Sequence, residues 1–328
     1  MTMRGLPSRI TQRLRLPLIA APMLRVSGPD LVITACLNGV VGAFPTANAR
    51  NLDELDAWLT RIVATLAQMP GRAAPWCPNL IMHRDAGRLR DEVALIVRHC
   101  VEMAITSVGS PAPVIPALHA AGCLVFADVA SIRHARRAIE AGADGLVLLT
   151  AGAGGQTGWL NGFAFVRAVR AFYDGPIVLA GGVSDGAALF AARALGCDLA
   201  YMGTRFIATD ESLASDAYKT MLVGSDADDV MLTRAVTGLP ASMLRPSLVA
   251  AGLDPDALDE SITPERARVL FGQAKDTERP ARWKDIWSAG HAVGGVSGVQ
   301  SVEHLVATTE REYDAARERM AAITGGAR

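Results

Sequence analysis

Eight short apolar segments recur along the first two thirds of the chain, and helical patterns separate them. Each segment is apolar throughout instead of alternating with polar residues, which is typical of parallel strands buried on both faces. Eight strand–helix units within about 200 residues predict a (β/α)₈ barrel, the TIM barrel. We therefore expect strands at residues 17–23, 40–45, 76–82, 104–109, 124–129, 145–149, 176–182 and 199–204.

The segments between these strands carry helix signals. Ser131 and Asp185 each precede a stretch of apolar residues at helical spacing, and the second stretch ends at Gly196. Serine and aspartate cap helix N-termini, and glycine commonly ends helices. The alternative fold is a doubly wound open sheet, whose usual sign is Gly-x-Gly-x-x-Gly after the first strand. Here the first strand ends in Ala-Pro-Met (21–23), so the barrel is favoured.

The alternating pattern stops after Thr204. Residues 208–285 hold helical pieces and many turn residues, so we predict an inserted helical cap over the barrel mouth. The barrel then comprises residues 1–207 and 286–328, with a last amphipathic helix around Leu305. Six apolar cap residues could shape a hydrophobic entry, pack as core or form a dimer face, with core packing as the default; they are Met221, Leu222, Met231, Leu232, Met243 and Leu244.

Amino-acid composition and net charge exclude several classes of binding partner. Half of the 328 residues are hydrophobic and the net charge is −1, which favours a folded domain over disorder and argues against nucleic acid or an anionic membrane. The five cysteines form no Cys-x-x-Cys clip, so we expect no disulfide framework and no metal. No apolar stretch reaches the roughly 18 residues of a membrane span. We expect a cytoplasmic protein with a small-molecule substrate, and a homodimer stays open.

Glycine-rich turns follow the seventh and eighth predicted strands. They contain Gly181 and Gly182 after the seventh, and Gly203 and Thr204 after the eighth. Glycine lets backbone N–H groups approach a phosphate, and barrels often bind phosphate at this place. We therefore predict a phosphate site there, although glycines of this kind also serve simple tight turns.

Polar residues at other strand ends are further candidates, because active sites of such barrels lie at the C-terminal ends of the strands. Asn79 ends the third strand, Asp128 the fifth, and residues 150–159 follow the sixth. His83 and His291 could reach the barrel mouth. We expect surface or packing roles for the histidines within predicted helices, which are His99, His119, His134 and His304.

The strand ends together resemble the nitronate monooxygenase (2-nitropropane dioxygenase) family of FMN-dependent barrel enzymes. The resemblance runs along nearly the whole chain and rests on the segments PLIAAPM, PNL, GADGLVLLTAGAGGQTG, VLAGGVSDGAAL, GCDLAYMGTRFIATDES and YKTMLVGSDADDVMLTRAVTGLPASMLR. Related barrels include FMN-dependent enoyl reductases and NADH:quinone reductases. The motifs are specific for this superfamily and much less specific for one reaction within it.

The resemblance implies an FMN site. It places Ala21, Pro22 and Met23 beside the flavin ring and lets Asn79 hydrogen-bond the flavin. It assigns the phosphate to Gly181, Gly182, Gly203 and Thr204, and the reactive face to the loop with Gly154 and Gly155. It also counts Asp144, at the start of the sixth strand, among the cofactor-binding residues, where it would help to order that region.

Two positions depart from the family pattern. Gln156 stands where relatives commonly have a histidine facing the flavin, and Asp128 stands where many have a lysine. A glutamine amide forms hydrogen bonds but cannot act as a base near neutral pH, whereas a nitronate is already deprotonated and needs none. Loss of the lysine removes a positive charge that would stabilise an anion. We give equal weight to two roles for Gln156, which are contact with the substrate and orientation of its loop.

The candidate catalytic residues are therefore Gln156, Asp128 and His83. The implied reaction is oxidation of an alkyl nitronate with O₂ to a carbonyl compound and nitrite. The alternative is an FMN-dependent reductase that uses NAD(P)H on an unsaturated, quinone or acyl-CoA substrate. A second alternative is a flavin-free phosphate-binding barrel isomerase or lyase, for which Asp128 and His83 would supply acid and base.

Overall fold

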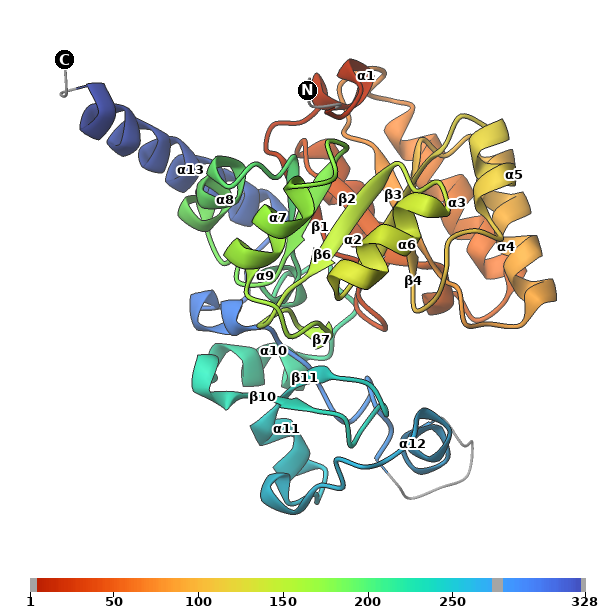
Figure 1. Cartoon of the computed structure of the whole chain (residues 1–328), viewed down its shortest axis with the longest axis vertical. Helices are drawn as coiled ribbons and strands as arrows, with labels where there is room; N and C mark the ends of the chain where they lie inside the picture. Colours follow the sequence, from red (N-terminus) through yellow and green to blue (C-terminus); the bar gives the residue numbers. More distant parts are fainter. Residues whose placement is uncertain (1–4, 273–279, 326–328) are drawn as a thin grey trace.

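Eight parallel strands close into a barrel in a computed structural model that describes residues 5–272 and 280–325 (Figure 1). The last strand pairs with the first, with Ala200 opposite Leu18, so the predicted barrel is confirmed and the open sheet is excluded. The barrel strands are β1 (Leu18–Ala20), β2 (Val41–Pro45), β3 (Trp76–Ile81), β4 (Met103–Ser107), β5 (Leu124–Val129), β6 (Gly145–Leu149), β8 (Ile177–Ala180) and β9 (Leu199–Met202).

Helices surround the barrel in chain order. The short α1 (Ser8–Thr11) precedes the barrel, and the final helix packs against α8 and α2 as the last member of the outer ring. The others are α2 (Pro29–Leu37), the 3₁₀ turn η1 (Thr46–Asn48), α3 (Leu52–Leu66), α4 (Ala86–Arg98), α5 (Ile115–Ala120), α6 (Ile132–Glu140), α7 (Gly162–Arg170), α8 (Gly186–Ala194), α9 (Thr204–Ile207) and α13 (Val302–Gly325).

Both predicted helix caps are present. The Ser131 hydroxyl accepts a hydrogen bond from the His134 backbone N–H at the start of α6, and the Asp185 carboxylate accepts one from Ala188 at the start of α8. The second helix ends just before Gly196, which has a φ of +101°. Such a φ is readily reached only by glycine, which explains the stop.

The inserted segment is not simply helical, which corrects the prediction for residues 208–285. It contains α10 (Asp216–Val223), η2 (Ala227–Asp229), α11 (Arg245–Ala250), η3 (Pro255–Ala257) and α12 (Pro264–Phe271), but also the antiparallel strands β10 (Val230–Thr233) and β11 (Ala241–Leu244). A third strand, β7 (Gly155–Gln156), comes from the loop after β6 and pairs with β11. The sheet therefore forms only because distant parts of the chain meet.

The apolar residues of this segment mostly pack inside it. Leu222, Met243 and Leu244 are fully buried, whereas Leu232 keeps 44% of its surface exposed. A large cavity lies at the barrel mouth, and none of the six candidates for a hydrophobic entry is among the described residues that line it. The default of core packing therefore holds for the buried residues, and the entry interpretation is wrong.

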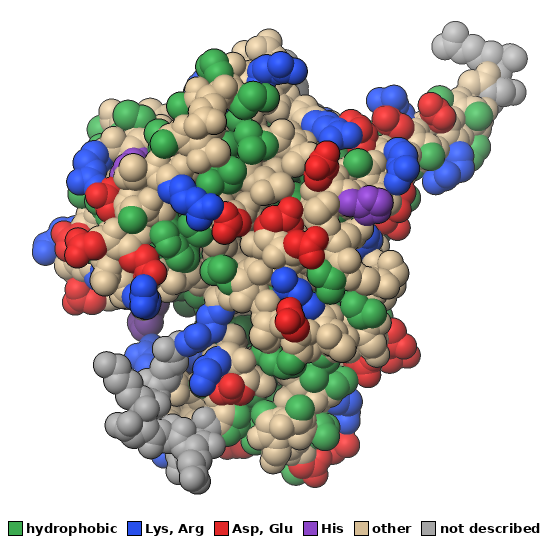
Figure 2. Space-filling model, turned by 180° about the vertical axis from the view of Figure 1, so that it is seen from behind, with side chains coloured by type: hydrophobic (Ala, Val, Ile, Leu, Met, Phe, Trp, Pro, Cys, Tyr) green, Lys and Arg blue, Asp and Glu red, His purple; other side chains and the backbone are tan. Residues whose placement is uncertain are grey.

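The final helix and the surface complete the picture. After the 3₁₀ turn η4 (His291–Gly295), α13 runs past the barrel wall and extends away from it (Figure 1). In residues 5–272 and 280–325, no helix combines the length and the apolar character that a membrane crossing requires. Lys and Arg side chains are interspersed with Asp and Glu on the face shown in Figure 2, as expected for a net charge of −1.

Candidate active site

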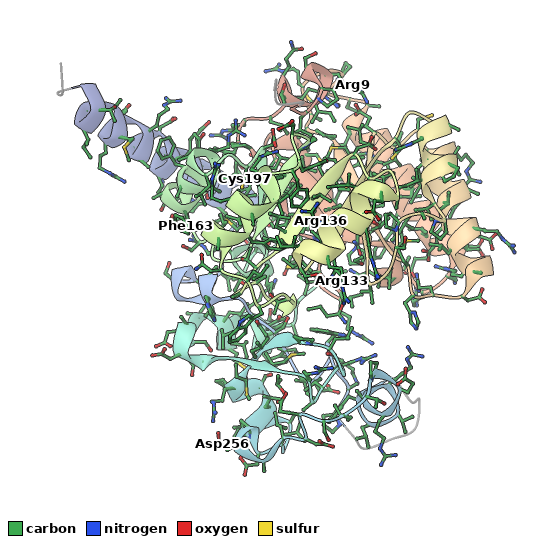
Figure 3. All side chains as sticks on the ribbon, in the orientation of Figure 1. Arg9, Arg133, Arg136, Phe163, Cys197 and Asp256 are labelled. Carbon is green, nitrogen blue, oxygen red and sulfur yellow. The ribbon has the colours of Figure 1, made fainter. Side chains whose placement is uncertain are left out.

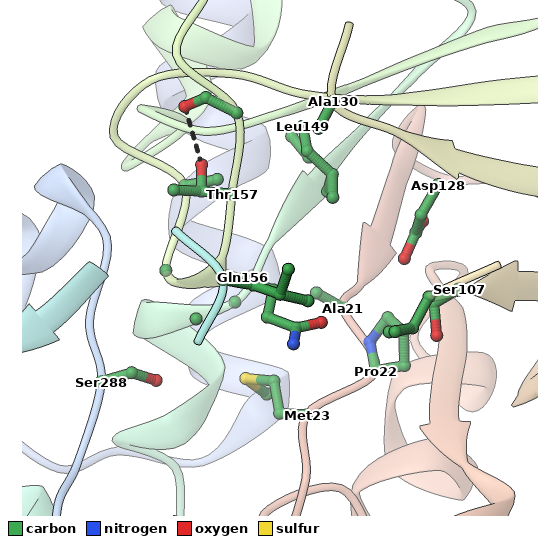
Figure 4. A pocket seen from close by; sticks show the side chains of 18 of the residues that line it. Ala21, Pro22, Met23, Ser107, Asp128, Ala130, Leu149, Gln156, Thr157 and Ser288 are labelled. Atoms are coloured by element: carbon green, nitrogen blue, oxygen red, sulfur yellow. Dashed lines mark hydrogen bonds between the residues drawn. The ribbon is translucent and has the colours of Figure 1, made fainter. Parts of the chain in front are cut away.

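A cavity of about 1300 Å³ lies at the C-terminal ends of the barrel strands, between the barrel and the inserted segment. Small-molecule sites usually measure about 300–1,000 Å³, so this one has room for more than a single small ligand. Thirteen of the predicted site residues line it, namely Ala21, Pro22, Met23, Asn79, His83, Asp128, Gly154, Gly155, Gln156, Gly181, Gly182, Gly203 and Thr204 (Figure 4).

Asp144 does not belong to this site, which corrects its predicted cofactor role. It immediately precedes β6 and therefore lies at the N-terminal end of the barrel, opposite the cavity. There its carboxylate accepts a hydrogen bond from the Val125 backbone N–H and pairs with His119. The pair tethers β5 to the start of β6, so the role of Asp144 is structural.

Hydrogen bonds fix the turn after β1. The Met23 N–H donates to the Ser27 hydroxyl, which donates in turn to the Ala21 carbonyl. The Asn48 amide donates to the Met23 carbonyl at 2.9 Å, and Arg25 completes the turn with a φ of +61°. Residues 21–23 therefore reach the cavity on a closed turn with few free backbone groups.

Asn79 presents a free amide to the cavity. The Ser107 hydroxyl donates to its side-chain oxygen at 3.2 Å, and this contact directs the amide nitrogen the other way. That nitrogen is buried and has no partner among the described residues. Buried donors are nearly always satisfied, so we expect a bound ligand to accept this hydrogen bond.

A buried ionic network supports Asn79 from behind. The Thr46 hydroxyl lies 3.2 Å from the Asn79 carbonyl and 2.8 Å from Glu92, whose side chain is fully buried. Arg84 and Arg88 both donate to the other carboxylate oxygen of Glu92, at 2.5 and 2.8 Å. The network ties the end of β3 to α4 and holds the Asn79 backbone in place.

Asp128 lies near the end of β5, two strands along the barrel from Asn79 on β3. Figure 4 shows its carboxyl group directed into the cavity. One carboxyl oxygen is buried without a partner, and burial raises the pKa of Asp128 to about 7. Charge is costly in such surroundings, so the group changes protonation near neutral pH, where a proton donor or acceptor is most effective.

Tyr201 is the third unsatisfied group, and the sequence prediction missed it. Four buried side-chain atoms lack a hydrogen-bond partner among the described residues, and three of them belong to residues that line this cavity: Asn79 Nδ2, Asp128 Oδ1 and Tyr201 Oη. Tyr201 lies within the apolar segment of β9, where a polar atom is unusual. That contrast is the signal that could have identified it.

The glycine turns after β8 and β9 form a cradle. Gly181 and Gly182 have φ values of +125° and +73°, which favour glycine strongly. A Cβ on Gly182 would meet no atom within 4 Å, so its surroundings leave space for a ligand. The backbone N–H groups of Gly181, Gly182 and Gly203 make no turn or loop hydrogen bond to a backbone oxygen of the described residues.

The glycines after β6 have a packing role as well. A Cβ on Gly154 would lie 2.8 Å from the Gly290 nitrogen, and one on Gly152 would lie 2.5 Å from the His291 ring. The Gly152 carbonyl also accepts the His291 N–H. The close approach of the returning segment therefore requires part of the bare backbone that the resemblance attributes to the flavin face.

Gln156 is held by the second sheet. It pairs with Ala241 across β7 and β11, and Figure 4 shows its side chain extending into the cavity on the side of Ala21 and Met23. Because its backbone is fixed by the ladder, the amide can serve a ligand. Thr204 is held similarly, since its hydroxyl accepts the Gly290 N–H at 3.0 Å.

His83 reaches the cavity as predicted, whereas His291 and His134 differ from their predictions. His83 lines the cavity at its exposed rim, whereas His291 is exposed and does not line it. His134 lines the cavity although a surface or packing role was expected. Burial lowers the pKa of His134, and the nearby Arg133 and Arg137 lower it further; Figure 3 shows Arg133 on this side of the barrel.

Aromatic residues on the other side of the cavity cover its inner part. Tyr218 and Trp287 stack with ring centroids 5.0 Å apart, and the Tyr218 hydroxyl donates to the Ser288 carbonyl. Burial raises the pKa of Tyr218 to about 12, so it stays neutral. These residues come from α10 and from the segment after α12, and their long separation in sequence hides them from motif analysis.

Comparisons with known proteins were consistent across sequence and structure. The sequence profile described as nitronate monooxygenase matches residues 9–308. A nitronate monooxygenase of Paraburkholderia phytofirmans is 29% identical, and the match covers 93% of this chain and 94% of that protein. The solved structure of nitroalkane oxidase from Streptomyces ansochromogenes has a TM-score of 0.76 and 26% identity, covering 95% of this chain and 100% of that chain.

A second relative carries a different activity in its name. The (3aS,4S,5R,7aS)-5-hydroxy-7a-methyl-1-oxo-octahydro-1H-indene-4-carboxyl-CoA dehydrogenase of Mycobacterium tuberculosis is 30% identical over 71% of this chain. The match spans 64% of that relative, which is less than two thirds of its length.

Proposed function

The chain belongs to the nitronate monooxygenase family and is an oxidoreductase, and we propose that it binds FMN and oxidises an alkyl nitronate with O₂ to a carbonyl compound and nitrite. One observation carries the proposal beyond the family. The buried amide nitrogen of Asn79 has no hydrogen-bond partner among the described residues, and it lines the same cavity as the glycine cradle. A free buried donor beside such a cradle is expected where a polar ligand completes the hydrogen bonds.

The residues present fit FMN. The free Asn79 amide matches an acceptor on the flavin ring, and the fixed turn at residues 21–23 offers an apolar edge beside it. Gly181, Gly182 and Gly203 offer backbone N–H groups of the kind that bind phosphate, and these groups make no turn or loop hydrogen bond to the backbone of the described residues. These residues would hold the cofactor.

When bound, FMN would supply the electron acceptor for the substrate and the electron donor to O₂. The protein's part is to handle protons and to orient the substrate. Below its pKa of about 7, Asp128 is neutral and does not repel an anionic nitronate. Above it, the carboxylate can take the carbon-bound proton of a neutral nitroalkane: the C–H bond breaks, an O–H bond forms on Asp128, and the electron pair stays on the substrate as the nitronate.

Gln156 would orient the substrate by hydrogen bonding. Its amide can donate to a nitro or nitronate oxygen, and its place on β7 keeps it at the cavity wall. The stacked rings of Tyr218 and Trp287 line the same cavity and would exclude water around the bound substrate, which strengthens such interactions. His83 lies at the exposed rim, so we place it outside the proton transfer.

A second candidate function is an FMN-dependent reductase or dehydrogenase that acts on an acyl-CoA substrate. Two observations favour it: the cavity is larger than one small ligand needs, and one relative is named for a carboxyl-CoA substrate. Arg268 and Arg282 line the outer cavity and could meet the phosphates of such a substrate or of NAD(P)H.

A visible spectrum of the purified protein tests the cofactor. A yellow protein with flavin absorbance is expected, and a protein that stays colourless after incubation with FMN refutes both functions. Anaerobic mixing then separates them. Bleaching by a nitronate supports the first function, whereas bleaching only by NADH, NADPH or an acyl-CoA supports the second.

A further inference from the structure

Tyr201 raises a question that the proposed function does not answer. Its ring lies inside the barrel among apolar neighbours such as Val178 and Leu199, where phenylalanine would pack equally well. The hydroxyl is buried and has no partner among the described residues. A buried hydroxyl without a hydrogen-bond partner is costly, so we expect a bound molecule to pair with it.

The second unsatisfied atom in the same part of the barrel is complementary. Asp128 Oδ1 is a buried acceptor without a partner, and Tyr201 Oη is a buried donor without one. Both side chains are directed into the same cavity inside the barrel, Asp128 from β5 and Tyr201 from β9. After the larger effect of burial, the charge of Asp128 also raises the pKa of Tyr201. No direct hydrogen bond joins them in the part of the chain that the structure describes.

We propose that one bound water molecule bridges Tyr201 and Asp128, so that Tyr201 is a positioning residue that controls the protonation of Asp128. The water accepts from the tyrosine hydroxyl and donates to the carboxyl oxygen, which satisfies both atoms. Buried waters typically join polar groups that are otherwise unpaired. Burial keeps Tyr201 protonated, so through the water its hydroxyl can donate toward the carboxylate and favour the charged form of Asp128.

Few other titratable groups near Asp128 could control its protonation in place of Tyr201. The other titratable groups near this part of the cavity are the buried Cys77 on β3, whose pKa burial raises, and four residues that line the cavity, namely His83, His134, Arg137 and Glu140. The remaining inward residues of the neighbouring strands do not titrate; they are Ile105 and Ser107 on β4, Val147 and Leu149 on β6, and Val178 and Ala180 on β8. Burial is the one cause that raises the pKa of Asp128.

This inference rests on the proposed function in one respect only, namely the proton transfer by Asp128. Its direct consequence is a titration that needs neither flavin nor substrate. Burial alone places the pKa of Asp128 at about 7. A donor held by Tyr201 should place the wild-type titration about one pH unit lower, because hydrogen bonds to charged groups are worth that much.

The test is carbon-13 NMR of the aspartate carboxyl groups, with the Asp128 signal identified by its loss in Asp128→Asn. The expected result is that Tyr201→Phe titrates about one pH unit higher than wild type. Tyr173→Phe is the control, because it removes a tyrosine hydroxyl that donates to Asp144 at the other end of the barrel. This control should leave the Asp128 titration unchanged.

Equal titration midpoints in folded wild type and Tyr201→Phe overturn the proposal. If Tyr201→Phe does not fold, Tyr201→Met, which also lacks the hydroxyl, is titrated in its place with the same expectation. A second measurement addresses mechanism. The pH midpoint of flavin reduction by a neutral nitroalkane should move upward by the same amount in Tyr201→Phe. A colourless protein would refute the proposed function while leaving the NMR test valid.

Discussion

Replacing Asp128 by asparagine should stabilise the protein, and only at higher pH. Folding buries this carboxyl and raises its pKa from the 3.8 of an exposed aspartate to about 7. Between these values the folded protein holds a proton that the unfolded chain has released, so stability falls as pH rises. Asparagine resembles the neutral acid in shape and does not ionise, so Asp128→Asn avoids this loss.

The size of the effect follows from the two pKa values. The full difference corresponds to an upper limit of about 4 kcal/mol above pH 7. If Tyr201 lowers the pKa of Asp128 by about one pH unit, the limit falls to about 3 kcal/mol. Below about pH 4 the variant and the wild type differ only by the small cost of exchanging a hydroxyl for an amide.

Urea unfolding of the flavin-free protein, repeated from pH 4 to pH 8.5, measures this difference directly. The free energy of unfolding of Asp128→Asn relative to wild type should grow through the acidic range and level off once the folded carboxyl has ionised. Asp91→Asn at an exposed position controls for the loss of one charge. A difference that stays constant across the pH range would refute a buried, proton-retaining Asp128.

Three further substitutions test the network, the cradle and the loop. Glu92→Ala should lower the free energy of unfolding by about 3–5 kcal/mol in urea titrations, because it leaves two arginines facing a buried, uncompensated gap. Gly182→Val should weaken FMN binding about tenfold or more in fluorescence titrations, since valine is strained at a φ of +73° and its side chain enters the cradle. The control is Gly71→Val, which introduces the same strain at a φ of +69° in an open turn and should bind FMN normally. Gln156→Ala should raise KM for a nitronate about tenfold by loss of a hydrogen bond, and unchanged kinetics would make Gln156 purely an orienting residue of its loop.

The barrel was predictable because its information is local. Each strand is a short run of apolar residues, and Ser131 and Asp185 mark helix starts within a few residues of the helices that they cap. The strand ends then place Asn79 and Asp128 at one mouth by geometry alone. Asp144 follows the same rule in reverse, since a residue that precedes a strand lies at the opposite end of the barrel.

What escaped prediction depends on contacts between distant segments. The strands β10 and β11 are four residues each, and their partner β7 has only two residues, so no local pattern announces the sheet. The support of Asn79 by Thr46 and Glu92 joins three separate elements. Tyr201 was visible as a polar atom in an apolar strand, but only the barrel geometry shows that Asp128 faces the same space.

The two-residue strand β7 has a consequence for how such enzymes can diversify. It belongs in sequence to the barrel and in hydrogen bonding to the inserted segment, so both parts of the chain build this stretch of the cavity wall. Exchanging the inserted segment between relatives would therefore carry a compatibility requirement at residues 155 and 156. Recombination that respects this seam leaves the glycine cradle unchanged, because its turns follow β8 and β9 and are inherited with the barrel.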